Sequence, residues 1–251
     1  MIIRSGSPLK SLLKILLRRL RVIGSADIPR DLRKLPILPV EAAYDLWADT
    51  YSPEAHNALM TLEQAAMLSV MPPLAGRRAL DLACGTGRYS RIAAQVGAAT
   101  VVGADNSLAM LRKMKTLLSP GAFPIHVLQA SMDILPFPSA TFDVVICALA
   151  TGHLPPAVLR RAIMEMARVL SPGGEVLISD FHPALYALGG RRTLIAPDGQ
   201  IYAVEHYPHT LDDYRDAVAA AGLRIVALAE PQAEFQRRQV EAVLVLKCQK
   251  L

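Results

Sequence analysis

The sequence predicts an α/β protein with a doubly wound, seven-stranded sheet that is mostly parallel and has an antiparallel last strand. From residue 75 onward, short apolar runs alternate with helical stretches. Strands that alternate with helices and are apolar along their length lie buried on both faces of a parallel sheet. Only the short segment 230–239 separates the last two apolar runs. Because a parallel pair needs a longer crossover, we expect this pair to be antiparallel. The expected fold is Rossmann-like, with an N-terminal helical cap.

The individual elements follow from the spacing of apolar residues and from the turn residues between them. The strand candidates are residues 79–83, 100–104, 125–129, 142–148, 175–179, 224–229 and 240–247. The helix candidates between them are residues 88–96, 107–118, 156–170 and 211–221. Earlier in the chain, we expect an amphipathic helix over 8–23, followed by cap helices over 40–49 and 53–70.

The basic charge of the chain is concentrated at its N-terminus. The formal net charge is +5, yet residues 1–34 hold nine cations and two anions, so this segment carries +7 and the rest carries −2. We expect three regions: a basic segment and linker over 1–34, a helical cap over 35–74, and a catalytic domain over 75–251 with a hairpin insertion at 184–210. Because the catalytic body is mildly acidic, no nucleic-acid partner is expected.

Several classes of protein are disfavoured by composition. The three cysteines form no CxxC or Cys/His cluster, so we expect neither a metal site nor a disulfide framework. No uninterrupted apolar run reaches the length of a transmembrane helix. We expect a cytoplasmic protein, although composition alone leaves a mitochondrial presequence open. A leucine face opposite lysine and arginine over residues 8–23 is typical of peripheral contact with an anionic membrane, and packing on the protein itself is the alternative.

A glycine-rich loop after the first strand of the sheet predicts a cofactor site. Gly85 and Gly87 allow a tight turn and a close backbone approach to a ligand. Asp105 ends the next strand, twenty residues after Gly85, where a carboxylate can bind both hydroxyls of an adenosine ribose. A dinucleotide enzyme shares these features, but position 90 is Ser90 rather than the third glycine. Asp81 would also repel a pyrophosphate, whereas it suits the positively charged S-adenosylmethionine. That cofactor is therefore the prediction.

The sequence motifs together resemble those of the class I S-adenosylmethionine-dependent methyltransferases. The stretches LDLACGTGRYS, VVGADNSLAML and EMARVLSPGGEVLISDFHP are similar to family motifs, and ASMDILPFPSATFDVVICALATGHL resembles the stretch with the adenine-binding acid. The resemblance covers about residues 40–250 and implies the strand order 3-2-1-4-5-7-6. It is greatest for ubiquinone/menaquinone C-methyltransferases and malonyl-carrier-protein O-methyltransferases. The cofactor-binding candidates are Tyr44, Asp81, Ala83, Cys84, Gly85, Gly87, Asp105, Asn106, Met110, Ser131, Met132, Asp133 and Cys147.

Two of these candidates depend on particular arguments. Tyr44 lies in AYDLWADTY, which is similar to an element whose first tyrosine covers the cofactor in that group, and Tyr51 is a weaker candidate. Asp133 follows the third strand, where a carboxylate can accept a hydrogen bond from the adenine amino group. Ordinary helix packing and turn formation are the structural alternatives for these residues.

Acceptor chemistry is expected at the carboxyl ends of the strands, where ligands bind in open α/β sheets. His153, His182 and His206 follow or adjoin these ends and are the candidate catalytic bases, with loop-shaping roles as the alternative. The insertion 184–210 is expected to form a lid over the substrate. The leading hypothesis is methyl transfer to a small-molecule acceptor, with a lipid- or quinone-like molecule as one option. The alternatives are a macromolecule, either RNA or protein, and an acyl group on a carrier protein. The sequence does not indicate the oligomeric state.

Overall fold

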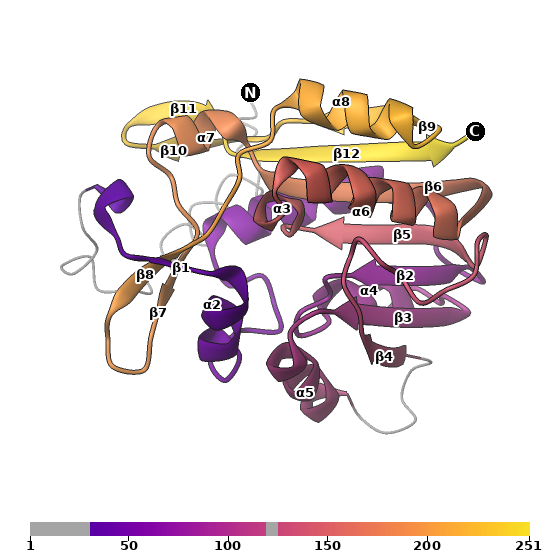
Figure 1. Ribbon diagram of the computed structural model, residues 1–251, viewed down its shortest axis with the longest axis horizontal. Helices are drawn as coiled ribbons and strands as arrows, with labels where there is room; N and C mark the ends of the chain where they lie inside the picture. Colours follow the sequence, from indigo (N-terminus) through magenta and orange to yellow (C-terminus); the bar gives the residue numbers. More distant parts are fainter. Residues whose placement is uncertain (1–30, 119–124) are drawn as a thin grey trace, which may run out of the picture. The chain divides into compact units, whose positions relative to one another are not determined.

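A computed structural model describes residues 31–118 and 125–251 of the chain (Figure 1). The helix expected over 8–23 lies outside the described residues, as does most of the basic segment 1–34. Residues 31–251 form one compact unit, which includes the expected cap region. Among the described helices, none is long and apolar enough to cross a membrane.

The main sheet has seven strands, and its order confirms the expected fold. The order is β4-β3-β2-β5-β6-β12-β9, which is the order 3-2-1-4-5-7-6 when only these strands are numbered. β12 is antiparallel to both of its neighbours, with Val245 opposite Ser179 on β6 and Ala229 on β9. The strands are β2 (Arg78–Leu82), β3 (Thr100–Asp105), β4 (Ile125–Gln129), β5 (Phe142–Ala148), β6 (Leu170–Phe181), β9 (Leu223–Ala229) and β12 (Val243–Lys250).

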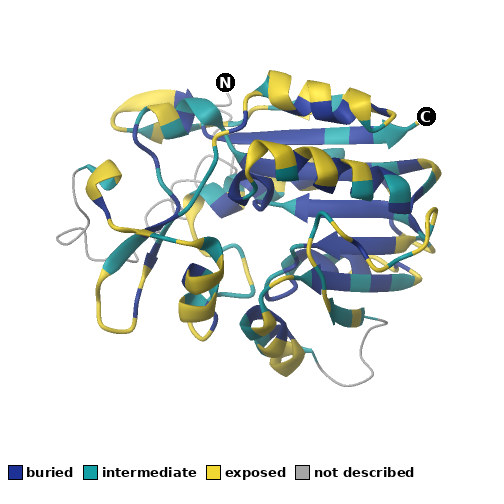
Figure 2. Ribbon diagram, viewed as in Figure 1, coloured by how far each residue is buried: buried dark blue, intermediate teal, exposed yellow. Residues whose placement is uncertain are grey.

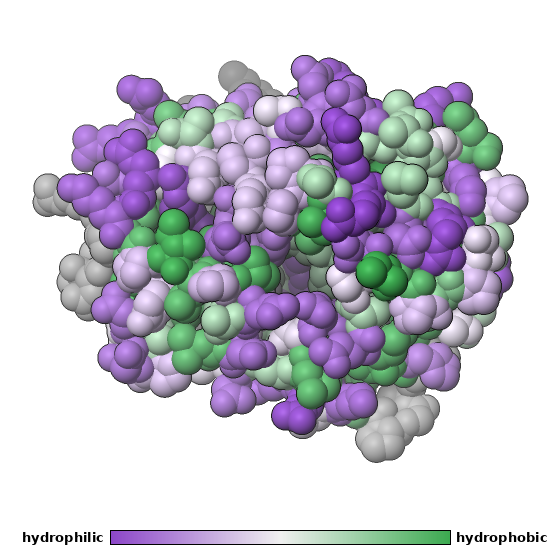
Figure 3. Space-filling view, viewed as in Figure 1, coloured by the Kyte–Doolittle hydropathy of each residue, from purple (hydrophilic) through white to green (hydrophobic). Residues whose placement is uncertain are grey.

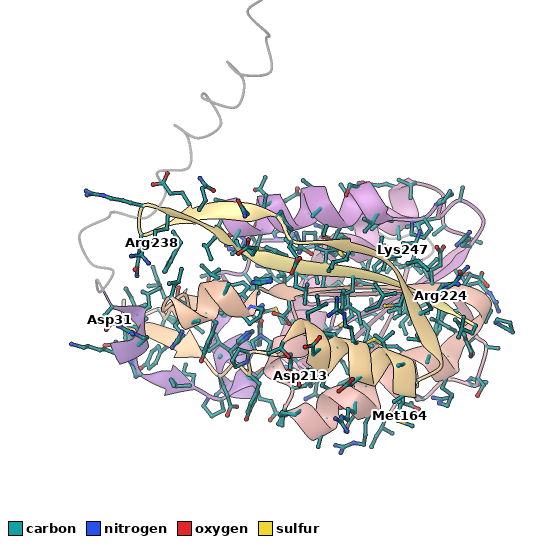
Figure 4. All side chains as sticks on the ribbon, turned by 90° about the horizontal axis from the view of Figure 1, so that it is seen from above. Asp31, Met164, Asp213, Arg224, Arg238 and Lys247 are labelled. Carbon is teal, nitrogen blue, oxygen red and sulfur yellow. The ribbon has the colours of Figure 1, made fainter. Side chains whose placement is uncertain are left out.

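Helices cover both faces of this sheet, as its apolar strands require. Successive residues of β5 face opposite layers: Ile146 packs in one hydrophobic cluster and Cys147 in the other. Met164 of α6 and Asp213 of α8 lie on the same side of the sheet (Figure 4), and in Figure 2 the strands are largely buried while the outer faces of these helices are exposed. The helices are α2 (Val40–Trp47), α3 (Ala58–Val70), α4 (Arg88–Gln95), α5 (Leu108–Leu117), α6 (Pro156–Val169), α7 (Pro183–Ala187) and α8 (Leu211–Ala220).

Helix starts follow local capping chemistry. Thr210 and Asp213 form a capping box at α8, in which each side chain bonds the other residue's backbone N–H. At α3 the Asn57 side chain accepts a hydrogen bond from the backbone N–H of Met60, so the helix begins at Ala58. The expectation of a helix from residue 53 was therefore wrong, because the cap residue fixes a later start.

Two regions differ from the expectations. Segment 230–239 is not a simple turn: a hairpin of β10 (Gln232–Phe235) and β11 (Arg238–Glu241) begins in it and extends to residue 241. Arg238 marks the tip of this hairpin in Figure 4. The second difference is that the cap is not purely helical, because β1 (Ile37–Leu38) pairs in parallel with β8 (Ile201–Val204) of the insertion.

The expected hairpin of the insertion is present. β7 (Thr193–Ile195) pairs antiparallel with β8, and β1 completes a three-stranded sheet in the order β1-β8-β7. In Figure 1 the β5 arrow points toward the carboxyl ends of the parallel strands, and the small sheet and α2 lie beyond those ends. Hydrophobic side chains are visible over the region of β1, β8 and α2 in Figure 3. The pairing joins the insertion to the cap, so the two form a common wall beside the carboxyl ends of the parallel strands.

Candidate active site

A cavity of about 280 Å³ lies at the carboxyl ends of the parallel strands, between the glycine loop, the cap and the insertion. This is where ligands bind in open α/β sheets. Most of the residues selected from the sequence contribute to its lining. They are Tyr44, Asp81, Ala83, Cys84, Gly85, Asp105, Asn106, Met110, Ser131, Met132 and His153.

The glycine loop between β2 and α4 adopts the tight turn that the sequence requires. Gly87 is the residue that caps α4, with a φ of 85°. A Cβ atom on Gly87 would lie 2.7 Å from Cε of Met114. Only glycine fits here without a rearrangement, since its backbone is left-handed and its neighbour is close. Gly87 thus shapes the loop and is not part of the cavity lining.

Asp81 is a buried carboxylate held by the first turn of α4. One of its oxygens, Oδ2, accepts hydrogen bonds from the backbone N–H of Ser90 at 2.7 Å and from its hydroxyl at 2.6 Å. The other oxygen, Oδ1, has no hydrogen-bond partner among the residues that the structure describes. Burial raises the pKa of Asp81 to about 6, although the bonds from Ser90 oppose this. A cationic ligand group beside Oδ1 would compensate the cost of burying this charge.

Asp105 joins the end of β3 to the glycine loop. Its Oδ2 accepts a hydrogen bond from the backbone N–H of Gly85 at 2.8 Å, and its Oδ1 accepts one from Ser107 at 2.8 Å. Burial raises the pKa of Asp105, and these backbone bonds oppose the shift. Each carboxylate oxygen can accept two hydrogen bonds, so one position on each remains for a ligand hydroxyl.

A buried polar chain crosses the opposite side of the cavity. Nη1 of Arg192 donates to the Tyr44 hydroxyl at 2.9 Å, and the distance from this hydroxyl to Nε2 of His153 is 2.9 Å. Nδ1 of His153 lies 2.8 Å from the carbonyl oxygen of Glu205. Because a carbonyl only accepts, Nδ1 carries the proton, and Tyr44 donates to Nε2. The order of donors therefore runs from Arg192 through Tyr44 to His153.

His153 is neutral in this environment. Burial, with a contribution from the nearby Arg192 charge, lowers the pKa of His153 to about 3. Its Nε2 atom already accepts a hydrogen bond from Tyr44, so the ring is a weak proton acceptor at neutral pH. The geometry suits a residue that orients Tyr44 and Arg192 more than it suits a strong general base.

The other two histidine candidates do not line the cavity. His182 caps α7: its Nδ1 accepts from the backbone N–H of Ala184, and Nε2 contacts Glu230 at 3.1 Å. His206 stacks on Tyr186 with ring centroids 5.3 Å apart. Burial lowers the pKa of His206 to about 4. Direct acceptor chemistry remains a prediction for both, but their positions favour structural roles.

Two further cofactor candidates also lie outside the cavity lining. The Asp133 carboxylate accepts hydrogen bonds from Ser131 at 2.6 Å and from Arg161 at 2.9 Å, and these bonds lower its pKa. Cys147 is fully buried on β5 with its sulfur 3.7 Å from that of Met132. An adenine contact by Asp133 stays a prediction. Cys147 does not line the cavity but packs against Met132, which does.

A buried ionic cluster that no motif indicated fixes the cap to the glycine-loop helix. Glu63 of α3 is 0% exposed and pairs with Arg88 at 2.8 Å. The same carboxylate accepts hydrogen bonds from the hydroxyls of Tyr89 at 2.9 Å and Ser179 at 2.6 Å. These contacts connect α3, α4 and β6. They position the cap over the cavity, since removing one partner would leave a buried charge uncompensated.

Arg192 is the functional residue that sequence reasoning missed. It lies in the insertion just before β7, inside no recognisable motif, and only the fold brings it next to Tyr44, 148 residues away in the chain. A doubled arginine, Arg191-Arg192, next to an apolar strand was the one available signal. The structure separates the pair: Arg191 covers the ring of Tyr186, whereas Arg192 lines the cavity.

Comparison with known proteins agrees with this geometry. Residues 79–174 match a family model described as a methyltransferase domain. The UbiE C-methyltransferase of ubiquinone/menaquinone biosynthesis from Syntrophotalea carbinolica is 43% identical over 107 residues, which cover 41% of this chain and 44% of the relative. The match assigns residues 79–174 to a methyltransferase domain.

Two further comparisons extend the similarity along the chain. A ubiquinone biosynthesis O-methyltransferase from Xylella fastidiosa is 29% identical over 179 residues, covering 70% of this chain and 69% of the relative. An S-adenosylmethionine-dependent methyltransferase structure from Mesorhizobium loti matches with a TM-score of 0.61 at 22% identity, over 75% of this chain and 98% of that one. The latter likeness concerns the fold. The chain spans about half the length of two UbiE relatives, 44% and 56%.

Proposed function

We propose that this protein transfers a methyl group from S-adenosylmethionine to a small-molecule acceptor and releases S-adenosylhomocysteine. The observation that carries the proposal is the pair of carboxylates on either side of the glycine loop in one cavity, Asp81, which is buried, and Asp105, which is half-buried. Asp81 suits the positively charged amino acid end of the cofactor, and Asp105 suits its ribose hydroxyls. A pyrophosphate cofactor would be repelled by Asp81.

The residues of the chain provide binding, orientation and exclusion of water. When bound, the cofactor supplies an activated methyl group on a positively charged sulfur. Tyr44 and His153 form a fixed wall of the cavity, and the insertion 184–210 contributes Arg192 to it. We assign the insertion the role of a lid that limits access of water and selects the acceptor.

A lipid- or quinone-like acceptor is the finer form of this proposal. The support for it is that two relatives described above are named as methyltransferases of ubiquinone or menaquinone biosynthesis. Peripheral contact of residues 8–23 with an anionic membrane would bring the protein to such an acceptor. Methylation of RNA, protein or a carrier-bound acyl group is the alternative function.

Two measurements test the proposal. Isothermal titration calorimetry should show binding of S-adenosylmethionine and S-adenosylhomocysteine, and no comparable binding of NAD. A labelled methyl donor incubated with fractionated metabolite extracts should then yield a labelled small molecule. Tight NAD binding without S-adenosylmethionine binding would refute the cofactor assignment. Label appearing only in RNA or protein would favour the alternative function.

A further inference from the structure

Arg192 is a buried cation whose hydrogen-bonding capacity is only partly used. The residue is 8% exposed and lines the cavity. Its Nη1 atom donates to the Tyr44 hydroxyl at 2.9 Å and to the carbonyl oxygen of Leu149 at 2.5 Å. Both are neutral acceptors, so neither of them compensates the positive charge.

The remaining donors of the guanidinium lack partners. Nε and Nη2 are buried, and neither has a hydrogen-bond acceptor among the residues that the structure describes. The nearest ionic partner is Asp180, whose Oδ1 lies 3.6 Å from Nη2. The two Asp180 oxygens already accept hydrogen bonds from Thr151 at 3.0 Å, from the backbone N–H of Phe181 at 2.7 Å and from that of Gly152. Asp180 is therefore only a partial partner for Arg192.

Leaving such donors unused is costly. A buried donor without an acceptor is destabilising, and the cost is larger when the group is charged. Nε and Nη2 together form one edge of a planar guanidinium, which is the edge that binds two oxygens of a carboxylate at once. An anionic ligand group would remove the cost and fill both positions.

We propose that Arg192 binds an anionic oxygen group of the methyl acceptor, so that the acceptor is a carboxylate or another ionised oxygen compound. The inference rests on the proposed function, because it names the acceptor class of that same cavity. A modest rotation of the guanidinium within the cavity wall would present its free edge to the ligand. This rotation would release the Nη1 bond to the Tyr44 hydroxyl, and the oxygens of the ligand would take the place of that acceptor.

The location of Arg192 favours the acceptor over the cofactor. Asp81 at the glycine loop suits the positive groups of the cofactor, whereas Arg192 comes from the insertion and contacts the segment after β5. A guanidinium and a sulfonium in one cavity repel each other unless an anion lies between them. An ionised acceptor in that position would be attracted by both charges.

A matched pair of probes tests the proposal without knowledge of the natural acceptor. The full chain is titrated with benzoate and benzamide, and with acetate and acetamide, both with and without saturating S-adenosylhomocysteine. Fluorescence of Trp47, the chain's only tryptophan, reports binding because its ring stacks on Tyr44 at 6.0 Å. We expect at least one carboxylate to bind tenfold or more tightly than its amide.

Variants connect this preference to Arg192. Arg192→Met should abolish the preference while S-adenosylhomocysteine affinity stays within threefold, and Arg192→Lys should retain part of it. Arg191→Met is the matched control, because Arg191 donates to the carbonyl oxygens of Tyr186 and Gly190 and does not line the cavity. It should keep the full preference. Thermal unfolding checks that each variant is folded. If Arg192→Met is unfolded, the comparison between the parent chain and Arg192→Lys provides the test.

The opposing outcomes are distinct. No preference in the full chain under either condition overturns the proposal. A preference that Arg192→Met leaves intact also overturns it, as does one that Arg192→Lys leaves undiminished where Arg192→Met is unfolded. A tenfold loss of S-adenosylhomocysteine affinity in Arg192→Met, with the preference intact, would assign the residue to the cofactor carboxylate instead. Absence of S-adenosylhomocysteine binding in the full chain would refute the proposed function, while the titrations without it still decide whether Arg192 selects anions.

Discussion

Ser90 donates two hydrogen bonds to a single oxygen of Asp81, one from its backbone N–H at 2.7 Å and one from its hydroxyl at 2.6 Å. This arrangement fixes the carboxylate and leaves Oδ1 available to a ligand in the cavity. Position 90 is where a dinucleotide-binding loop has its third glycine, which has no hydroxyl to donate. One residue thus both departs from the dinucleotide pattern and supports the acid that suits a cationic cofactor.

The first prediction concerns the pH dependence of cofactor binding through Asp81. Burial raises its pKa from 3.8 to about 6 in the free protein, and a bound cation favours the ionised form. Binding therefore releases a proton below pH 6. S-adenosylmethionine affinity should rise by at most about tenfold per pH unit up to pH 6 and level off above it. Calorimetry between pH 5 and 8 measures this.

Stability should change in the opposite direction. Because the folded protein holds the Asp81 proton more tightly than the unfolded chain, its free energy of unfolding should fall as pH rises from about 4 to 6. Asp81→Asn should remove both effects, since an amide does not titrate in this range. If the affinity of Asp81→Asn follows the same pH profile as the parent chain, another group is responsible.

The second prediction is that Asp105→Ala weakens S-adenosylmethionine binding by about 1.5–3 kcal/mol, the scale of hydrogen bonds to a charged group. The loss includes a looser glycine loop, because Asp105 also accepts from the backbone N–H of Gly85. Asp143→Ala is a matched control. Its carboxylate pairs with Arg78 at 2.7 Å and does not line the cavity. Equal effects of the two substitutions on the dissociation constant would refute a ribose contact by Asp105.

The sheet was predictable because each of its elements is marked by neighbouring residues. Apolar runs of strand length, glycine turns and apolar residues at helical spacing recur along the chain. The cofactor loop was predictable for the same reason, since Asp81, Gly85 and Asp105 lie within one strand–turn–helix–strand unit. The acceptor side was not. Arg192 and Tyr44 are 148 residues apart and meet where the cap packs against the insertion, with β1 paired to β8. A two-residue strand such as β1 leaves no periodic signal. The sequence does not separate the two possible roles of His182, because a histidine that caps a helix and a catalytic histidine look alike in it.

The third prediction compares two tyrosines of the cap. Tyr44→Phe removes a hydroxyl that accepts from Arg192 and donates to His153, so it should lower the free energy of unfolding by about 1–3 kcal/mol. Tyr51 lines the same cavity, but its hydroxyl forms no hydrogen bond with the described residues. Tyr51→Phe should change stability by no more than about 0.5 kcal/mol. Denaturant unfolding of both variants provides the test, and a Tyr44→Phe variant as stable as Tyr51→Phe would contradict the polar chain.

The fourth prediction is that Gly152→Ala is destabilising by about 1–3 kcal/mol, the usual cost of overpacking. A Cβ atom at this position would lie 2.1 Å from Cε1 of His206 and 2.7 Å from its Nδ1. Either the imidazole or the turn Thr151–His153 would have to move. Repeating the substitution in a His206→Ala background should recover most of the loss. Additive effects in this double-mutant cycle would show that the two residues are not in contact in solution.

The last prediction concerns residues 8–23, which lie outside the residues that the structure describes. Their leucine spacing with opposing lysine and arginine residues predicts binding to an anionic membrane interface. Each basic residue near such a surface contributes about 1 kcal/mol, and the net +7 of residues 1–34 makes the total substantial. The full chain should therefore sediment with anionic liposomes, less with neutral ones, and less again at high salt. A variant that starts at Leu35 keeps β1 and should remain in the supernatant while retaining S-adenosylmethionine binding. If the two chains sediment equally, or neither does, the leucine face packs against protein rather than lipid.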